Sequence, residues 1–133
     1  MIKACIFDLD GTIADTVESI AVVGNRLLRH YGLQEEPVEN YNFYAGDGAD
    51  ELVKRILHAA HGTETVDYEE ARTLYRKWFE EDPFYHVKPF EGIMQLLTAL
   101  KEEGIKIGVC SNKPHHAAVD VVNKIFGADL FDK

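Results

Sequence analysis

The chain has 133 residues, enough for one compact domain or for a core with a small insertion. Its 46% hydrophobic and 28% charged residues are typical of a folded protein and exclude a disordered one. A formal net charge of −9 argues against nucleic acid as a main partner, because phosphate backbones bind basic surfaces. A small phosphorylated substrate stays compatible with this charge, since a metal ion and a few aimed donors can reverse the local field.

The expected location is the cytoplasm. The chain has two cysteines that lie far apart and no secretory segment, which indicates a reducing compartment. No apolar run approaches the length needed to span a membrane, so we expect no membrane association.

The first predicted element is a strand over residues 3–9, K-A-C-I-F-D-L. A short apolar run rich in β-forming residues predicts a strand buried on both faces, as in a parallel sheet. The D-G-T tripeptide that follows ends the strand.

Helical patterns dominate the next part of the chain. Apolar residues recur at three- and four-residue steps over 15–31, 49–60 and 68–81, which predicts three helices. Residues 34–48 are polar and rich in turn formers, and Pro83 is expected to end the third helix.

Two local features of these helices carry expectations of their own. Asp15 or Thr16 is expected to cap the first helix. Tyr75, Trp78 and Phe79 have the spacing of core residues, so we expect them to pack inside the helical part rather than to stack on a ligand.

The pattern after Pro89 is that of an α/β protein. It predicts a helix over 91–103, a strand over 105–110 and a helix over 115–126, with 130–132 as the approach to a third strand. Strand, helix, strand and helix in this order imply a parallel sheet.

The helical stretch is too long for an ordinary connection within such a sheet. We expect residues 1–14 and 86–133 to form a partial α/β core and residues 15–85 to form a helical cap. The cap would stand over the carboxyl ends of the strands, where open α/β sheets bind their ligands.

Asp8 and Asp10 are the main candidates for chemistry, because they come where the first strand ends. Residues two apart share a face of a strand, so the two carboxylates can converge, although the turn bends Asp10 away from strict alternation. Two such carboxylates repel one another, and a divalent cation such as Mg²⁺ would relieve that cost. The pair also supplies a nucleophile and a proton donor or acceptor. The simpler alternative is a strand-end turn with solvated aspartates.

Ser111 and Asn112 hold the matching position at the end of the second strand, just before a helix that starts near Pro114. A hydroxyl in front of a helix amino terminus can bind an anion. A plain helix cap is the alternative interpretation.

The chain resembles the haloacid dehalogenase superfamily. F-D-L-D-G-T resembles the first motif of that superfamily, V-C-S-N resembles the second, and the helical stretch resembles its helical cap. Y-N-F-Y-A-G-D-G-A-D-E-L-V-K-R-I-L and C-S-N-K-P are similar to phosphoglycolate phosphatases. The implied fold is a Rossmann-like parallel sheet with an inserted all-helical cap.

The resemblance also implies a role for each motif residue. Asp8 would attack phosphorus and form an aspartyl phosphate, and Asp10 would protonate the leaving alkoxide and then activate water. Mg²⁺ would be held at Asp8 and Asp10, the latter through its backbone carbonyl. The remaining implied contacts to the phosphate or its loop come from Gly11, Thr12, Ser111 and Asn112.

The family's third and fourth motifs, a lysine and an acidic cluster, normally lie beyond the point where this sequence ends. The sheet core is therefore expected to be incomplete here, with a bare edge and an uncovered apolar face on the first strand. We expect an amino-terminal portion of a longer protein, little activity from this chain alone, and association through that edge as an open possibility.

Two further positions keep two interpretations each. Lys113 could stand in for the missing lysine or be a solvated lysine near a helix start. The loop Gly46-Asp47-Gly48 could be a plain turn or could contact the non-phosphate end of a substrate.

The resulting hypothesis is a magnesium-dependent hydrolase of small phosphate monoesters, with 2-phosphoglycolate as the preferred substrate. The alternatives are a sugar phosphomutase of the same superfamily and a non-catalytic fragment that only holds phosphate or a partner chain.

Overall fold

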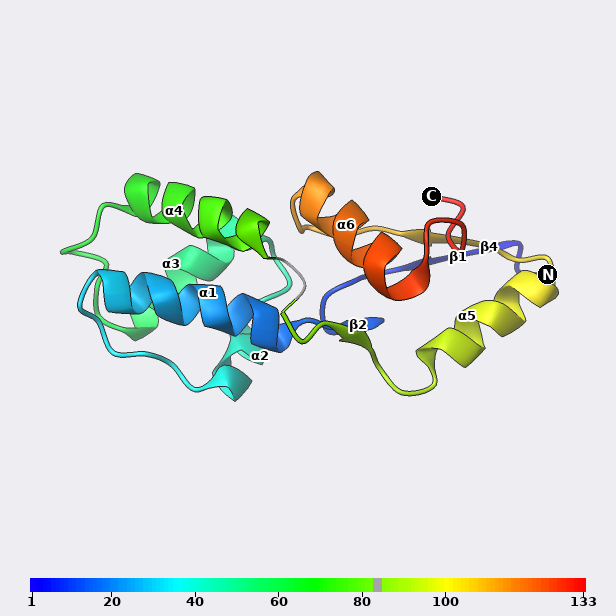
Figure 1. Cartoon of the computed structure of the whole chain (residues 1–133), viewed down its shortest axis with the longest axis horizontal. Coiled ribbons are helices and arrows are strands. Elements are labelled where there is room, and N and C mark those ends of the chain that lie inside the picture. The colour runs from blue at the N-terminus through cyan, green and yellow to red at the C-terminus, as the bar shows by residue number, and fades with distance from the viewer. Residues whose placement is uncertain (83–84) are drawn as a thin grey trace.

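The computed structural model describes residues 1–82 and 85–133 of the chain. It has two lobes joined by a narrow waist, one made of helices and one that combines helices with a parallel strand pair (Figure 1).

The α/β lobe is built on two parallel strands, β1 (Ala4–Phe7) and β4 (Lys106–Val109). Two helices, α5 (Ile93–Glu102) and α6 (His115–Phe126), flank them (Figure 1). One apolar cluster joins these elements; its fully buried members include Leu9, Ile13, Leu97, Ile107 and Val121. The predicted parallel sheet and α/β class are confirmed.

Strand β1 is not buried on both faces, so that expectation is wrong. Exposure alternates along the strand, and the Ile6 side chain is 74% exposed. Phe7 packs on the core cluster, whereas no described residue pairs with the second edge of β1. Among the described residues, the second edge of β1 is therefore free and Ile6 is left uncovered.

The helical lobe contains the three predicted helices, α1 (Val17–His30), α3 (Ala49–Ala59) and α4 (Tyr68–Glu81). Its core packs α4 against both α1 and α3. The end of α4 at Glu81 agrees with the prediction, while Pro83 itself lies outside the described residues.

Two short helices were not predicted: η1 (Val38–Asn40) and α2 (Tyr41–Tyr44). They fold the polar 34–48 segment back onto α1, where the Tyr41 ring is fully buried and its hydroxyl donates to Asn25 Oδ1 at 2.9 Å. The segment therefore contributes a buried aromatic ring to the core, which its polar composition does not predict.

Two short strands connect the lobes. β2 (Ala14–Asp15) pairs antiparallel with β3 (Lys88–Pro89), so the outgoing and returning chain lie side by side at the waist (Figure 1). The chain passes between the lobes at these two strands, and the domain limits at 15 and 85 stay a prediction.

The segment after α6 runs along β4 without forming an assigned strand. The Asp132 N–H donates to Ile107 O at 2.8 Å, and the Val109 N–H donates to Lys133 O at 3.0 Å. The Ile107 N–H in turn donates to the Asp132 carboxylate and lowers the pKa of that group.

Within residues 1–82 and 85–133, no helix has the length and apolar character needed to cross a membrane.

Candidate active site

A small cavity of about 40 Å³ lies between the two lobes. That volume holds roughly three water molecules, which is comparable to the three free oxygens of a phosphoryl group. The α/β lobe contributes Asp8, Asp10, Ser111, Asn112 and Lys113 to its lining, and the helical lobe contributes Gly46, Gly48, Tyr75 and Phe79.

A tight turn brings Asp8 and Asp10 to this cavity. The Leu9 carbonyl accepts from the N–H groups of Thr12, Ile13 and Ala14 at 3.2, 3.2 and 3.1 Å, while the Leu9 side chain is fully buried. The buried leucine anchors the turn, so the aspartates on either side of it both face the cavity. Their convergence is the arrangement expected from their spacing.

Asp10 is held by two donors on one oxygen. Thr16 Oγ1 donates to Asp10 Oδ1 at 2.6 Å, and Lys113 Nζ lies 3.2 Å from the same atom. Thr16 therefore occupies the cap position of α1 without capping it, because its hydroxyl is turned to the aspartate. The expected side-chain cap is replaced by a contact that orients a candidate catalytic group.

Lys113 is buried, so its interpretation as a solvated lysine near a helix start is wrong. Its side chain is 4% exposed, and its ammonium lies 4.4 Å from the centroid of the Phe79 ring. A buried ammonium needs opposite charge or other favourable partners to offset its lost hydration. Asp10 and Phe79 supply them here.

Ser111 and Asn112 both line the cavity but differ in orientation. Ser111 Oγ accepts from the Lys113 N–H at 3.1 Å, which orders the turn that enters α6. Asn112 Nδ2 donates to Gly46 O at 3.0 Å, so the side-chain amide contacts the helical lobe. The loop at Gly46 thus faces the site, as one of its two interpretations requires.

Gly11 and Thr12 are placed differently from the other motif residues. Neither belongs to the lining of the cavity, and Thr12 is exposed. Gly11 has φ +78°, a left-handed conformation in which a side chain would be strained, so it serves the turn. The geometry does not support a phosphate contact from either residue.

Tyr75 and Phe79 are the site residues that sequence reasoning assigned only to packing. They are one helical turn apart on α4, so one face of that helix both fills the core and closes the cavity. Burial, and then the nearby Tyr41 and Asp10, raise the pKa of Tyr75 well above its ordinary value. Its phenol therefore stays protonated and can donate a hydrogen bond.

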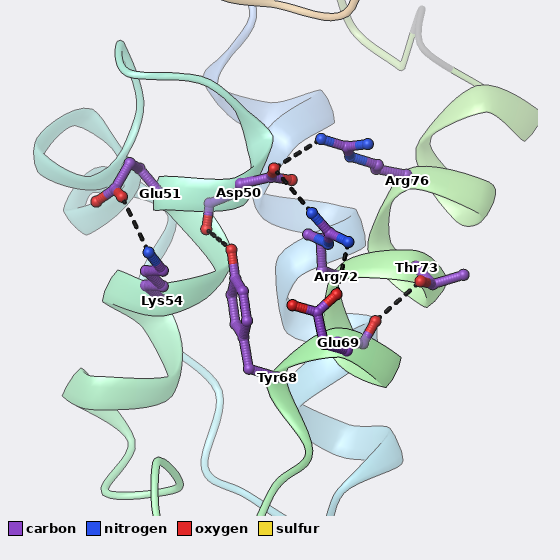
Figure 2. Close-up of polar contacts among 8 residues, drawn as sticks. All are labelled: Asp50, Glu51, Lys54, Tyr68, Glu69, Arg72, Thr73 and Arg76. Carbon is purple, nitrogen blue, oxygen red and sulfur yellow. Dashed lines mark hydrogen bonds and ion pairs between the residues drawn. The ribbon is translucent and has the colours of Figure 1, made fainter.

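A second cavity of about 430 Å³ adjoins the first and shares Gly48, Ala49, Tyr75, Phe79, Asn112 and Pro114 with it. Its charged lining consists of Asp47, Asp50, Arg76 and Glu80. Arg72 and Arg76 reach from α4 to Asp50 on α3, at 3.5 and 2.7 Å (Figure 2). This cavity has room for the non-phosphate end of a substrate.

The oxygen donors at the first cavity suit Mg²⁺ in type. Magnesium is usually held by one or two carboxylates and keeps several waters. Asp8 and Asp10 provide that minimum, while the described residues contain no cluster of three His, Cys, Asp or Glu side chains. His115 and His116 are exposed and do not add to the site.

Comparisons with known proteins agree with this fold and show the family of the chain. A family model described as haloacid dehalogenase-like hydrolase matches residues 5–133. Phosphoglycolate phosphatases from Aquifex aeolicus and Cereibacter sphaeroides are 31% and 33% identical, over 98% and 96% of the chain. The chain spans 58% and 59% of the length of these relatives.

Solved structures share the fold of this chain. A predicted phosphoglycolate phosphatase from Haemophilus somnus superposes with a TM-score of 0.88 at 22% identity, over 98% of this chain and 60% of that one. A β-phosphoglucomutase from Clostridium difficile superposes with a TM-score of 0.72 at 28% identity, over 99% and 60%. With a family match over nearly its whole length, the chain belongs to the haloacid dehalogenase-like hydrolases.

Proposed function

We propose that this chain carries the nucleophile half of a phosphatase site that hydrolyses small phosphate monoesters. The observation that carries the proposal is the meeting of Asp8, Asp10, Ser111 and Lys113 around one cavity of phosphoryl size. Two carboxylates, a hydroxyl and an ammonium are the groups needed to attack a phosphate ester and bind its oxygens.

Asp8 is the nucleophile in this proposal. It is exposed at the cavity and open to an entering substrate, whereas Asp10 is largely covered. A carboxylate oxygen of Asp8 bonds to phosphorus as the bond from phosphorus to the ester oxygen breaks. Asp10 donates a proton to the departing alkoxide, and we assign this step to Oδ2 because Thr16 and Lys113 both occupy Oδ1.

The second half of the reaction returns the site to its starting state. Asp10 takes a proton from a water molecule, whose oxygen attacks phosphorus and releases inorganic phosphate and the free Asp8 carboxylate. Lys113 and the Ser111 hydroxyl stabilise negative charge on the phosphoryl oxygens in both steps. The Asp8 carboxylate and the Asp10 backbone carbonyl would hold Mg²⁺, which, when bound, neutralises phosphate charge and relieves the repulsion between the carboxylates.

The preferred substrate is 2-phosphoglycolate. The name of the Aquifex aeolicus relative supports this choice, as does its 31% identity. In the larger cavity Arg76, which also pairs with Asp50, offers a guanidinium for the single carboxylate of such a substrate, although Asp47 and Glu80 also line that space.

A sugar phosphomutase is the second candidate. The 28% identity to a β-phosphoglucomutase and the 430 Å³ of the adjoining cavity favour it, because that volume exceeds what a glycolate needs. A mutase would use the same aspartates and return the phosphoryl group to the sugar.

The cytoplasmic location stays a prediction.

The test compares this chain with a fusion in which the remaining carboxyl-terminal part of the Aquifex aeolicus relative follows residue 133. We expect the folded fusion to release phosphate from 2-phosphoglycolate only when Mg²⁺ is present, and the 133-residue chain to release little. Asp8→Asn in the fusion should reduce the rate at least about a thousandfold, since it removes the nucleophile.

A panel with β-glucose 1-phosphate separates the two candidates. Free phosphate indicates the hydrolase and an isomerised sugar phosphate indicates the mutase. A fusion that folds, as judged by circular dichroism, and does neither in the presence of Mg²⁺ contradicts both.

A further inference from the structure

The Lys113 ammonium lies between groups from the two lobes. On one side it is 3.2 Å from Asp10 Oδ1 in the α/β lobe, and on another it lies 4.4 Å from the centre of the Phe79 ring in the helical lobe. The lysine side chain is 4% exposed and the whole Phe79 residue 5% exposed, so water has little access to this contact.

The Phe79 ring is a suitable partner for a desolvated ammonium. The face of an aromatic ring carries partial negative charge and attracts a cation within about 6 Å of its centre, most strongly where water is excluded. Unlike a second carboxylate, a ring adds no full negative charge beside incoming phosphate oxygens. It can therefore hold the lysine without competing with a phosphoryl group for the cavity.

We propose that Phe79 is a positioning residue, whose ring holds the Lys113 ammonium over the phosphate cavity and so links the position of the helical lobe to phosphate binding. The inference rests on the proposed function of the cavity. Phe79 belongs to α4 and stacks on Tyr75 of the same helix, with ring centroids 5.9 Å apart. The ring consequently moves with the helical lobe, and displacement of that lobe uncovers the lysine.

The competing explanation is that Phe79 only packs in the core. A leucine at this position distinguishes packing from the cation–aromatic contact. Phe79→Leu keeps an apolar side chain in the space but removes the aromatic face. Phe79→Tyr keeps the face. Trp78→Leu is the matched control. Trp78 directly precedes Phe79 on α4, and its ring centroid lies 4.1 Å from Arg26 Cζ, a cation–aromatic pair away from the cavity.

The first measurement is the NMR shift of the Lys113 protons next to Nζ. A proton over an aromatic face is displaced upfield, so we expect an upfield shift in the unmodified chain and in Phe79→Tyr and Trp78→Leu. In Phe79→Leu the shift should return to the value of an ordinary lysine. An ordinary shift in the unmodified chain overturns the proposal.

The second measurement is the affinity for inorganic phosphate in the presence of MgCl₂, followed by NMR titration. Phe79→Leu should weaken binding about two- to thirtyfold, the range that corresponds to a cation–aromatic contact. Trp78→Leu should leave it unchanged. In a Lys113→Met background, Phe79→Leu should cause no further loss, because the residue acts through the lysine.

The outcomes distinguish this inference from the proposed function. If the unmodified chain binds phosphate and Phe79→Leu weakens binding equally with and without Lys113, the positioning role is wrong and the phosphate site remains. If the unmodified chain binds no phosphate, the proposed function of the cavity fails and the link to phosphate binding fails with it.

Discussion

At the scale of single residues, the position of Asp10 follows from its sequence motif, whereas its contacts do not. Its spacing from Asp8 predicts that both carboxylates face one site, because the strand end sets their direction. The motif spacing does not predict its contacts with Thr16 and Lys113. Lys113 lies more than a hundred positions away, and its burial depends on a ring from the other lobe.

The bond from Thr16 gives a prediction at this scale. Thr16→Val keeps the shape of the side chain but removes the donor to Asp10 Oδ1, so we expect a loss of about 1.5 to 3 kcal/mol in the free energy of unfolding, the range for a hydrogen bond to a charged group. Urea titration measures it. Thr16→Ser should retain most of the stability, and equal losses in both variants would contradict the role of the hydroxyl.

At the scale of elements, agreement between sequence and structure follows the strength of the apolar pattern. Helices α4 and α6 occupy the predicted ranges, because each has a continuous apolar face and a clear start or end signal. Helix α2 was missed, because four residues carry no period and its existence depends on burying Tyr41 against α1. The pairing of β2 with β3 was missed for a similar reason, since strands of two residues leave no pattern.

The contact between α1 and α2 provides the prediction at this scale. A methyl group added at Gly24 would lie 2.5 Å from the Tyr41 ring, although alanine normally favours a helix over glycine by about 1 kcal/mol. We expect Gly24→Ala to destabilise the chain by about 1 to 3 kcal/mol, the cost of overpacking a core. Chemical denaturation measures the change.

Val22→Ala, on an exposed part of the same helix, is the control and should change stability by less than about 1 kcal/mol. A stabilised Gly24→Ala variant would show that α2 can move away from α1 without penalty.

At the scale of the whole molecule, the cavity exists only because two lobes meet. The α/β lobe supplies the charged and hydroxyl groups, and the helical lobe supplies Tyr75, Phe79 and the loop at Gly46. Sequence reasoning expected the helical part to lie over the strand ends, and residues of α3 and α4 do line the cavity there. It could not predict which face of α4 turns inward to the site.

The uncovered face of β1 also belongs to this scale. Ile2 and Ile6 are 68% and 74% exposed, and, in the part of the chain that the structure describes, the second edge of β1 has no partner strand. We expect the 133-residue chain to self-associate as its concentration rises, as measured by sedimentation velocity. Ile6→Thr should reduce the association, and Val22→Thr on the helical lobe should not. A chain that stays monomeric throughout would contradict the role of this edge.

The central claim is that the cavity between the lobes binds a phosphoryl group through residues of both strand ends. Its most direct test is an NMR titration of the labelled chain with inorganic phosphate and MgCl₂, in which every backbone amide is followed. We predict that the largest shifts fall on Asp8, Asp10, Ser111 and Lys113, and that Lys113→Met weakens binding about tenfold or more. Shifts that centre elsewhere, or no saturable shifts, would contradict the claim.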